Sequence, residues 1–367
     1  MKKIISMGVR TALYAVIASG AALLAAVPGM AQQPVKIGVG GSNFLNLTYY
    51  YLTLPGPLGY WKEEGFDVDV FPVSGSTEAA QQLAVNNLDF AEMNASVIIQ
   101  SNTEHDLPIR AVITNGTVGW GLAVKKGGAI KSAADLKDRT IGIVSLSSGG
   151  IPLLRSFIAS AGLDPDTDVT LIATGVGAPA LTALQSGRVD ALMYWSSALV
   201  GFINAEPEID IIRDPEWLKM PDFTFSTSKR VMDENPKMVE GIARGVAKAM
   251  VFAAANPDCV RQIQWKFYPD TKPTGVDEEE AIRNELALLD AVLEEQKFAA
   301  EINPDNMVAA ASVSALGSVQ DFLFEAGVIT DKVDPKQLVV ADNSFWQKVN
   351  DFDKAEIEAQ AKACELP

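Results

Sequence analysis

The stretch DVDVFPVSGSTEAAQQLAVNNLDFAEMN, residues 67–94, determines the fold expected for this chain. Its opening run, 67–73, is typical of a β-strand, and a helix capped by Ser76 or Thr77 follows it. The run LDFAEMN, 88–94, has the character of a further strand. A helix that separates two such strands predicts a parallel βαβ unit, the building block of α/β proteins.

The same alternation of strands and helices extends on both sides of this unit. Further strands are predicted at 35–40, 109–115, 139–144, 168–174, 191–195 and 209–215. A second small α/β unit begins after Trp120, whereas the chain from Pro221 onward is mostly helical, with apolar residues at helical spacing over 282–293. A chain of 367 residues is long enough for two domains or lobes.

The first 31 residues have the order of a secretory signal peptide. The chain begins MKK and continues through Arg10 into an apolar stretch at 11–26. Small residues follow at Gly29 and Ala31, the two positions that a signal peptidase recognises before its cleavage site. The apolar stretch is short for a membrane span, although an N-terminal anchor is the alternative. We therefore expect cleavage after Ala31 and a periplasmic protein. The net charge of −16 argues against nucleic acid or anionic lipid as a partner.

Cysteine and histidine are scarce. Only Cys259, Cys364 and His105 are present, and their spacing matches no zinc motif, so we expect no metal site and no cofactor. In an oxidising compartment the two cysteines have two open interpretations. They form a disulfide that holds the C-terminal end of the chain, or they are two buried free thiols.

Short polar residues and glycines recur where the predicted strands end. In an open parallel sheet, ligands bind beyond the carboxyl ends of the strands, and helix N-termini there offer free N–H donors. Each loop taken alone is better explained as a turn, but their recurrence at successive strand ends favours a binding site. The predicted ligand-binding residues are Ser42, Asn43, Phe44, Ser74, Ser76, Asn94, Ser96, Asn115, Thr117, Ser147, Ser148, Gly149, Val176, Tyr194 and Trp195. Glu92 either meets a ligand amine or is a strand-edge charge.

Four segments carry a resemblance to a known family. They are GYWKEEGF at 59–66, the helix at 78–87 with the LDF that follows it, DLKDRTIGIVSLSSG at 135–149, and LTALQSGRVDALMYW at 181–195. With these segments the chain resembles the solute-binding proteins of bacterial ABC importers, in the branch that binds sulfonates, nitrate, taurine and thiamine pyrimidines. The resemblance covers nearly all of the chain after the signal peptide.

The resemblance implies an α/β, two-lobed periplasmic-binding-protein fold of type II. Each lobe would be a parallel-rich sheet flanked by helices, with a helical C-terminal extension. One lobe would comprise 34–119 plus 219–367 and the other 120–218, and the ligand would bind in the cleft between them. The implied partners are the transmembrane permease subunits of an importer with a cytoplasmic ATPase, and the protein would act as a monomer.

The same resemblance leaves the solute open. The first expectation is a small organic or inorganic anion, namely a sulfonate, a carboxylate or a nitrate-like ion. The alternative is an uncharged heterocycle such as a thiamine-pyrimidine precursor. A thiamine-pyrimidine-synthase-like enzyme of the same fold is disfavoured, because that chemistry needs a Cys-rich iron motif and active-site histidines, and this chain has one His. We therefore predict a binding protein with no catalytic residues.

Overall fold

The computed structural model describes residues 32–41, 45–340 and 343–367. The predicted signal peptide, 1–31, lies outside the described residues, and so do the predicted site residues Ser42, Asn43 and Phe44.

The first sheet combines four strands from the N-terminal part of the described chain with one strand that follows the second sheet. Its strands are β1 (Gln33–Val39), β2 (Phe66–Pro72), β3 (Phe90–Met93), β4 (Ile109–Thr117) and β10 (Pro221–Ser228), in the order β2-β1-β3-β10-β4. Strands β2 and β3 pair in parallel with β1, whereas β10 is antiparallel to both of its neighbours. The chain thus returns to this sheet through β10 after it has built a second one.

The second sheet is built from the intervening residues. Its strands are β5 (Gly121–Lys125), β6 (Arg139–Ile143), β7 (Val169–Ala173), β8 (Ala191–Tyr194) and β9 (Ile209–Ile212), in the order β7-β6-β8-β5-β9. Here β5 is the antiparallel strand, and β6 pairs in parallel with β7 and β8. Each sheet is therefore mixed but mostly parallel, as expected from the alternation of strands and helices.

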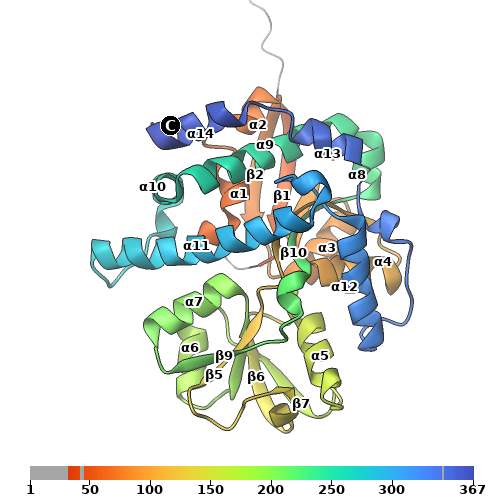
Figure 1. Cartoon of the computed structure of the whole chain (residues 1–367), viewed down its shortest axis with the longest axis vertical. Helices are drawn as coiled ribbons and strands as arrows, with labels where there is room; N and C mark the ends of the chain where they lie inside the picture. Colours follow the sequence, from red (N-terminus) through yellow and green to blue (C-terminus); the bar gives the residue numbers. More distant parts are fainter. Residues whose placement is uncertain (1–31, 42–44, 341–342) are drawn as a thin grey trace, which may run out of the picture. The chain divides into compact units, whose positions relative to one another are not determined.

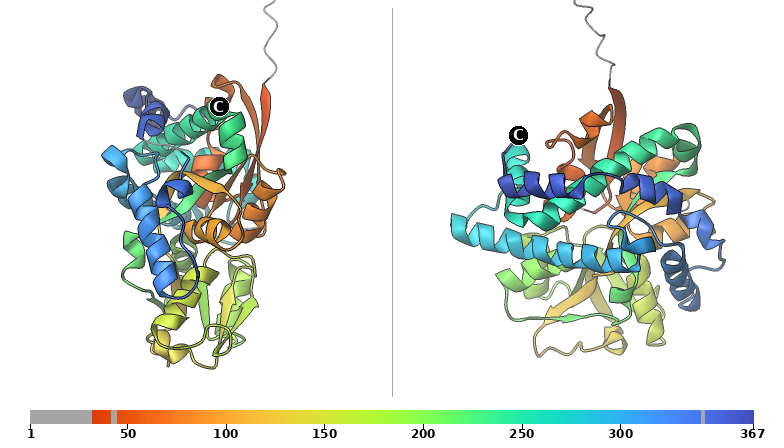
Figure 2. Two further views of the ribbon diagram at one scale, coloured as in Figure 1. Left: turned by 90° about the vertical axis from the view of Figure 1, so that its right-hand side faces the viewer. Right: turned by 45° about the horizontal axis from the view of Figure 1, so that its top comes forward.

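Helices cover both sheets (Figures 1 and 2). Those up to the end of the second sheet are α1 (Tyr50–Thr53), α2 (Tyr60–Glu63), α3 (Ser76–Ala84), α4 (Ala95–Thr103), α5 (Ile151–Ser160), α6 (Ala178–Gln185) and α7 (Ser196–Ala205). The C-terminal set is α8 (Lys229–Glu234), α9 (Pro236–Ala255), α10 (Pro257–Phe267), α11 (Glu278–Ile302), α12 (Val313–Glu325), α13 (Asn343–Val349) and α14 (Lys354–Ala363). Short 3-10 helices include η1 (Leu47–Tyr49), η2 (Ala133–Leu136), η3 (Trp217–Lys219), η4 (Pro269–Thr271), η5 (Pro304–Asn306) and η6 (Pro335–Leu338).

The long helix α11 joins the two halves of the fold. Asp277 caps it by accepting a hydrogen bond from the backbone N–H of Glu280, and three glutamates in its first turn suit the positive end of the helix dipole. One side of α11 packs on β4 of the first sheet and also on α7, which follows β8 of the second sheet (Figure 1). A rigid helix thus spans the junction between the two sheets.

The elements predicted from local pattern are confirmed. Every predicted strand is present, while the helix-like region around residues 45–64 is divided into η1, α1 and α2, with Pro55, Gly56 and Pro57 between α1 and α2. Within the described ranges, no helix is long and apolar enough to cross a membrane. No cluster of three or more His, Cys, Asp or Glu side chains that could hold a metal ion occurs among those residues.

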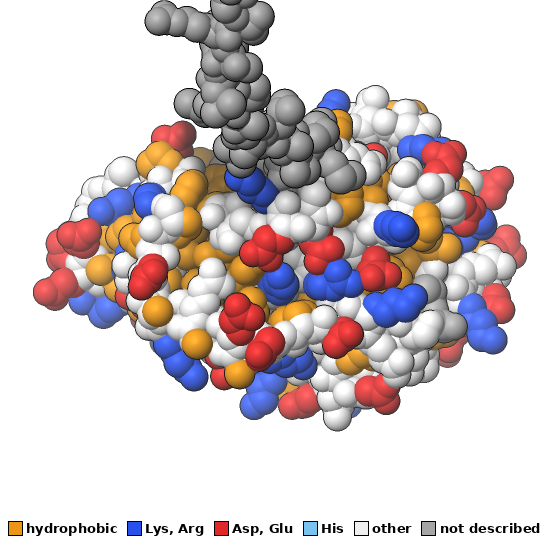
Figure 3. Space-filling model, turned by 90° about the horizontal axis from the view of Figure 1, so that it is seen from above, with side chains coloured by type: hydrophobic (Ala, Val, Ile, Leu, Met, Phe, Trp, Pro, Cys, Tyr) orange, Lys and Arg blue, Asp and Glu red, His pale blue; other side chains and the backbone are white. Residues whose placement is uncertain are grey.

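The face covered by α2, α9 and α14 carries mixed charge. Arg244 on α9 forms a two-pronged pair with Glu64 at 2.8 and 2.9 Å, and Lys248 on the same helix reaches Glu63 at 2.9 Å. Figure 3 shows basic and acidic side chains interspersed over this face, with no extended basic patch on it. The view therefore gives no support for a nucleic-acid surface there.

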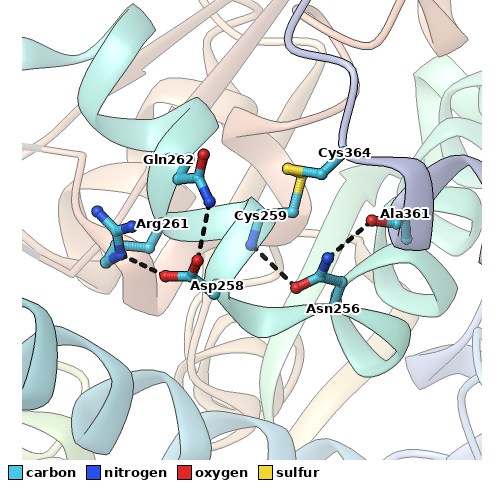
Figure 4. Close-up of a disulfide and its surroundings, with 7 residues drawn as sticks. All are labelled: Asn256, Asp258, Cys259, Arg261, Gln262, Ala361 and Cys364. Atoms are coloured by element: carbon cyan, nitrogen blue, oxygen red, sulfur yellow. Dashed lines mark hydrogen bonds and ion pairs between the residues drawn. A yellow bond between two sulfur atoms is a disulfide. The ribbon is translucent and has the colours of Figure 1, made fainter.

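Cys259 on α10 and Cys364 at the end of α14 form a disulfide. Asn256 strengthens the same junction, because its side chain accepts from the backbone N–H of Cys259 and donates to the carbonyl of Ala361 (Figure 4). Farther along α14, Gln360 accepts a hydrogen bond from the hydroxyl of Tyr60. The C-terminal helix is therefore held by one covalent bond and by several polar contacts.

We predict that the variant Cys364→Ser is less stable than the wild type. The bridge joins residues 105 positions apart, and on the chain-entropy account a loop of that length contributes about 4–5 kcal/mol. Chemical denaturation of both proteins, with and without reductant, measures the difference. Reductant should destabilise only the wild type; equal unfolding midpoints for the two proteins without reductant would contradict this prediction.

Candidate functional site

The strand-end loops of the two sheets contact each other directly. The backbone N–H of Thr77 donates to the Ser147 carbonyl at 3.2 Å, and the Ser145 hydroxyl donates to the Ser74 carbonyl at 2.6 Å. The Ser96 hydroxyl donates to the Gly149 carbonyl at 3.2 Å. Much of the polar chemistry that the sequence places at these strand ends is therefore used to join the loops of one sheet to those of the other.

Glycine allows this close approach. A Cβ atom on Gly75 would lie 2.3 Å from the Ser147 carbonyl oxygen, and one on Gly149 would lie 1.9 Å from Oδ1 of Asn94. A Cβ on Gly150 would meet the Trp120 ring at 2.3 Å. Real Cβ atoms do not come so near other heavy atoms, so a side chain at any of these positions would force the two sets of loops apart.

A small cavity, which we call the acidic cavity, lies where these loops meet. Its volume is about 10 Å³, close to the lower limit for a single water molecule. Its lining residues are Gly40, Gly41, Tyr49, Glu92, Asn94, Trp120, Val144, Ser148, Gly149, Trp195 and Phe223. Among these residues there is one formally charged side chain, that of Glu92, and no Lys or Arg.

Two buried carboxyl groups dominate the cavity and its wall. Glu92, at the end of β3, is 2% exposed, and its Oε2 has no hydrogen-bond partner among the residues that the structure describes. Asp222 on the neighbouring strand β10 is better satisfied. It accepts from the Ala95 backbone N–H at 2.8 Å, from the Asn94 amide at 2.5 Å and from the Trp120 indole at 3.0 Å.

Burial makes both carboxyl groups weak acids. It raises the pKa of Glu92 to about 8, an effect to which nearby Asp222 adds and which the Gly40 backbone opposes. The pKa of Asp222 rises only to about 6, because its hydrogen-bond donors stabilise the charged form. Glu92 thus has the less compensated charge of the two.

A third buried carboxyl comes from α11. Burial raises the pKa of Glu295 to about 8, while the Ser196 hydroxyl and Arg213 favour its charged form and Asp222 opposes it. The side chain fills the space beside Gly119, where a Cβ would lie 1.7 Å from Oε1 of Glu295. Three acids therefore lie near the crossing between the sheets, and the charge of Arg213 acts on one of them, Glu295.

The backbone beside this cluster is strained. Phe223, which lines the acidic cavity, has a φ of 53°, in the left-handed region that bulky residues avoid. It lies in β10 directly after Asp222 and before the register shift between Phe225 and Ser226. Such strain concentrates at functional sites, so this distortion marks the Asp222 region as more than a structural strand.

A larger cavity, which we call the apolar pocket, lies on the other side of Trp195. Its volume is about 340 Å³, within the range of small-molecule sites. Its lining residues are Asn46, Leu47, Thr48, Val176, Gly177, Ala178, Leu181, Trp195, Ser197, Ala198, Gly201, Phe202, Ala205, Thr271, Glu285 and Leu288. They come from η1 and α11 on one side and from α6 and α7 on the other. Across the pocket, the hydroxyls of Thr48 and Ser197 share a hydrogen bond of 2.8 Å.

The predicted site residues fall into three groups. Asn94, Ser148, Gly149 and Trp195 line the acidic cavity, and Val176 and Trp195 line the apolar pocket. Ser42, Asn43 and Phe44 lie outside the described residues. The others line neither cavity: Ser74, Ser76, Ser96, Asn115, Thr117, Ser147 and Tyr194.

Several residues of the third group have protein partners instead. The Ser76 hydroxyl accepts a hydrogen bond from the Asn94 backbone N–H and donates one to Oδ1 of the Asn94 side chain. These two bonds fix the start of α4. The Tyr194 hydroxyl contacts Thr174 and the Gly175 carbonyl. Ser147 offers its carbonyl to Thr77 of the facing loop. Ligand binding by these residues stays a prediction.

Sequence reasoning did not select Asp222, Glu295 or Trp120. An acidic residue within the apolar strand PDFTFSTS, residues 221–228, was a usable signal for Asp222. Glu295 carried no such signal, because α11 has eight acidic residues and nothing local distinguishes the two buried ones, Glu285 and Glu295. The position of Trp120 at the crossover is compatible both with stacking on a ligand and with packing between the lobes, and the sequence does not decide between them.

We predict that Gly75→Ala impairs closure of the two sets of loops. The added methyl group would clash with Ser147 unless the loops separate, and overpacking of this kind costs about 1–3 kcal/mol. Binding of a ligand identified by screening should weaken about fivefold to a hundredfold in calorimetry. Gly56→Ala is the control, since a Cβ at Gly56 has no atom within 4 Å. Equal affinities of the two variants would contradict the role of Gly75.

A solved structure shows the fold. The chain is similar to the alkanesulfonate-binding protein SsuA of Xanthomonas axonopodis pv. citri, with a TM-score of 0.59 and 16% identity over 83% of this chain and 97% of that one. At this identity the likeness concerns the fold alone. It confirms the periplasmic-binding-protein architecture expected from the sequence.

Two curated relatives share sequence with the chain. A putative binding protein of Brucella abortus is 27% identical over 218 residues, which cover 57% of this chain and 64% of that protein. The alignment thus spans less than two thirds of that relative. The riboflavin-binding protein RibY of Chloroflexus aurantiacus is 21% identical over 259 residues, or 69% of this chain and 72% of the relative.

The family comparison covers the central part of the chain. The model of the NMT1/THI5-like family matches residues 52–259, from α1 to the first turn of α10. Because this match includes more than half of the 367 residues, the chain belongs to the NMT1/THI5-like family, in agreement with the resemblance found in its sequence.

Proposed function

We propose that this protein is the periplasmic solute-binding component of an ABC importer. In this proposal the signal peptide, 1–31, directs export, and the lobes 34–119 plus 219–367 and 120–218 close on a solute. The monomer then delivers the solute to the transmembrane subunits of a permease powered by a cytoplasmic ATPase. Support comes from the family, from the likeness to SsuA and from the loops that meet between the sheets.

The orphaned carboxyl oxygen of Glu92 indicates what the solute carries. Ionising a buried carboxyl whose oxygen lacks a hydrogen-bond donor is costly, so Glu92 holds its proton to about pH 8 unless a ligand supplies an N–H donor or a positive charge in that place. The acidic cavity admits a group about the size of one water molecule, which an ammonium group matches. We therefore assign the solute a nitrogen head group, most simply a primary ammonium, that binds against Glu92.

The same electrostatics disfavour the anion that we expected first. A sulfonate, carboxylate or nitrate in the acidic cavity would face Glu92 and the nearby Asp222, and no cationic side chain lines this cavity among the described residues. The two relatives with named ligands bind different solutes, riboflavin and an alkanesulfonate, so the family does not decide the matter. A nitrogen-bearing compound, including the heterocycle considered as the alternative, suits the cavity better.

We predict that primary amines bind and that Glu92→Gln weakens their binding. A hydrogen bond to a charged group contributes about 1.5–3 kcal/mol, so the loss should be about tenfold to a hundredfold. A thermal-shift screen of alkylammonium ions, amino-heterocycles, alkanesulfonates, carboxylates and nitrate, followed by calorimetry, measures it. A ligand at 100 times its Kd adds about 2.7 kcal/mol of stability.

The exposed Glu301 on the same protein provides the control for that variant. Glu301→Gln makes the same substitution at a position that lines neither cavity and should leave the affinity unchanged. Stabilisation of the wild type by nitrate or alkanesulfonates, with no response to amines, would refute the assignment of a nitrogen head.

Affinity for an alkylammonium ion should rise with pH. Such an ion stays charged to about pH 10, so the titrating group is the protein's. Glu92 must lose its proton to pair with the ion, and its pKa is about 8, so binding should strengthen as pH rises from 6 to 9. The charged or titratable groups around it are Asp222, Tyr51 and Tyr49, the last of which lines the same cavity.

The stability of the ligand-free protein should fall as pH rises, whereas the affinity for an alkylammonium ion rises. The folded-state pKa of Glu92 lies above its ordinary value of 4.5, so the folded protein holds a proton that the unfolded chain releases, and stability falls as pH rises from about 4.5 to about 8. Denaturation curves at pH 5 and pH 8 should show this decline, and Glu92→Gln should reduce it. A decline of the same size in that variant would show that other groups cause it.

A further inference from the structure

The apolar pocket adjoins the acidic cavity through one shared side chain. Trp195 lines both, is only 3% exposed and lies edge-on to the Trp120 ring at 5.9 Å, while Trp120 donates to Asp222. The indole N–H of Trp195 has no hydrogen-bond partner in the described part of the chain. Trp195 is therefore a side chain that the water-sized acidic cavity shares with the much larger apolar pocket.

The walls of the apolar pocket are nearly all hydrocarbon. Leu47, Leu181 and Phe202 come from three different elements, and Leu288 closes the pocket from α11. The hydroxyls of Thr48 and Ser197 satisfy each other, so they demand no polar ligand group. Glu285 is the one charged side chain in the lining; its carboxyl interacts with Trp265 and Arg261 of α10, while its Oε2 has no hydrogen-bond partner among the described residues.

We propose that the apolar pocket binds the hydrocarbon body of the same solute whose ammonium head meets Glu92, so that the substrate class is an amphiphilic primary amine. This inference rests on the proposed function. The pocket volume of about 340 Å³ has room for an aromatic ring or a short alkyl chain. Elements on both sides of the junction, η1 and α11 as well as α6 and α7, form the pocket, so an apolar body there also favours the closed arrangement.

Gly201 offers a way to fill the pocket without touching the head site. It lies within α7, and a Cβ there would meet only Cδ2 of Leu288, at an ordinary 3.7 Å. Gly201→Ala therefore fits and leaves most of the pocket free, whereas Gly201→Leu places three more carbon atoms in it. Ala198→Leu, on the same helix and in the same lining, is a second filling variant should the first fail to fold.

Calorimetry with methylammonium, butylammonium and benzylammonium tests the inference. The wild type and Gly201→Ala should bind the larger ions more tightly, by about fourfold for each methylene group buried. Gly201→Leu should bring all three affinities close to that of methylammonium. Glu92→Gln should weaken binding of all three by one common factor. Circular dichroism and thermal midpoints confirm that each variant is folded.

The two proposals fail in different ways. If the affinities do not depend on the size of the ion, while Glu92→Gln still lowers them, the pocket proposal is wrong and the nitrogen head stands. A size dependence that Gly201→Leu and Ala198→Leu leave intact also overturns the pocket proposal.

If no amine binds, the proposed nitrogen head group is wrong. Uncharged benzyl alcohol then tests the pocket alone by ligand-observed NMR, and binding that is lost in Gly201→Leu supports an apolar subsite, whereas no binding to the wild type refutes it.

Discussion

The carboxylate of Asp222 joins three parts of the chain that are far apart in sequence. It lies on β10, holds the first backbone N–H of α4 and the Asn94 amide, and receives the indole N–H of Trp120 at the crossing to the second sheet. Trp120 in turn packs against Gly150 and Trp195, which belong to the second half of the fold. Asn94 and Trp120, two walls of the acidic cavity, are thus positioned by this one group.

The position of Asp222 has an electrostatic consequence. Hydrogen bonds largely compensate its own burial, but its charge raises the pKa of both Glu92 and Glu295, whose protons are therefore held to about pH 8. A chain selected only for stability would not gather three buried acids beside one arginine. The arrangement is understandable if a positively charged or N–H-bearing solute completes it, and the strained backbone at Phe223 is consistent with the same interpretation.

Local pattern was sufficient for most of the fold and for part of the site. The strands alternate with helices in the segments where apolar and β-branched residues alternate with capped amphipathic runs, and the loops at strand ends include Asn94, Ser148 and Trp195, which line a cavity. Ser76 looks the same in sequence, yet its hydroxyl bonds Asn94, and Ser74 and Ser147 contact the facing loops through their carbonyls. A hydroxyl at a strand end serves a ligand or a facing loop equally well, and only the packing of the two sheets decides between them.

The role of the buried acids at the site could not be predicted from local sequence either, because it too depends on how distant parts of the chain pack. Glu92 was noticed because it interrupts an apolar strand, but its isolation is visible only once Asp222 and Gly40 are placed around it. Glu295 lies some two hundred residues from Glu92 in sequence and is one of many acidic residues on its helix. Long-range packing, rather than any nearby pattern, makes it part of the site.

Helix α11 bears on why family membership does not identify the solute. The family match ends at residue 259, whereas α11 begins at Glu278 and supplies Glu285 and Leu288 to the apolar pocket and Glu295 to the acid cluster. These three residues lie three and seven positions apart, so they share one face of the helix. The strand-end loops that hold the two sheets together lie within the shared family region, and α11 adds a wall that the family match does not include. The choice of solute in this chain is therefore expected to depend strongly on α11, because one face of this helix contributes both hydrocarbon and charge to the junction.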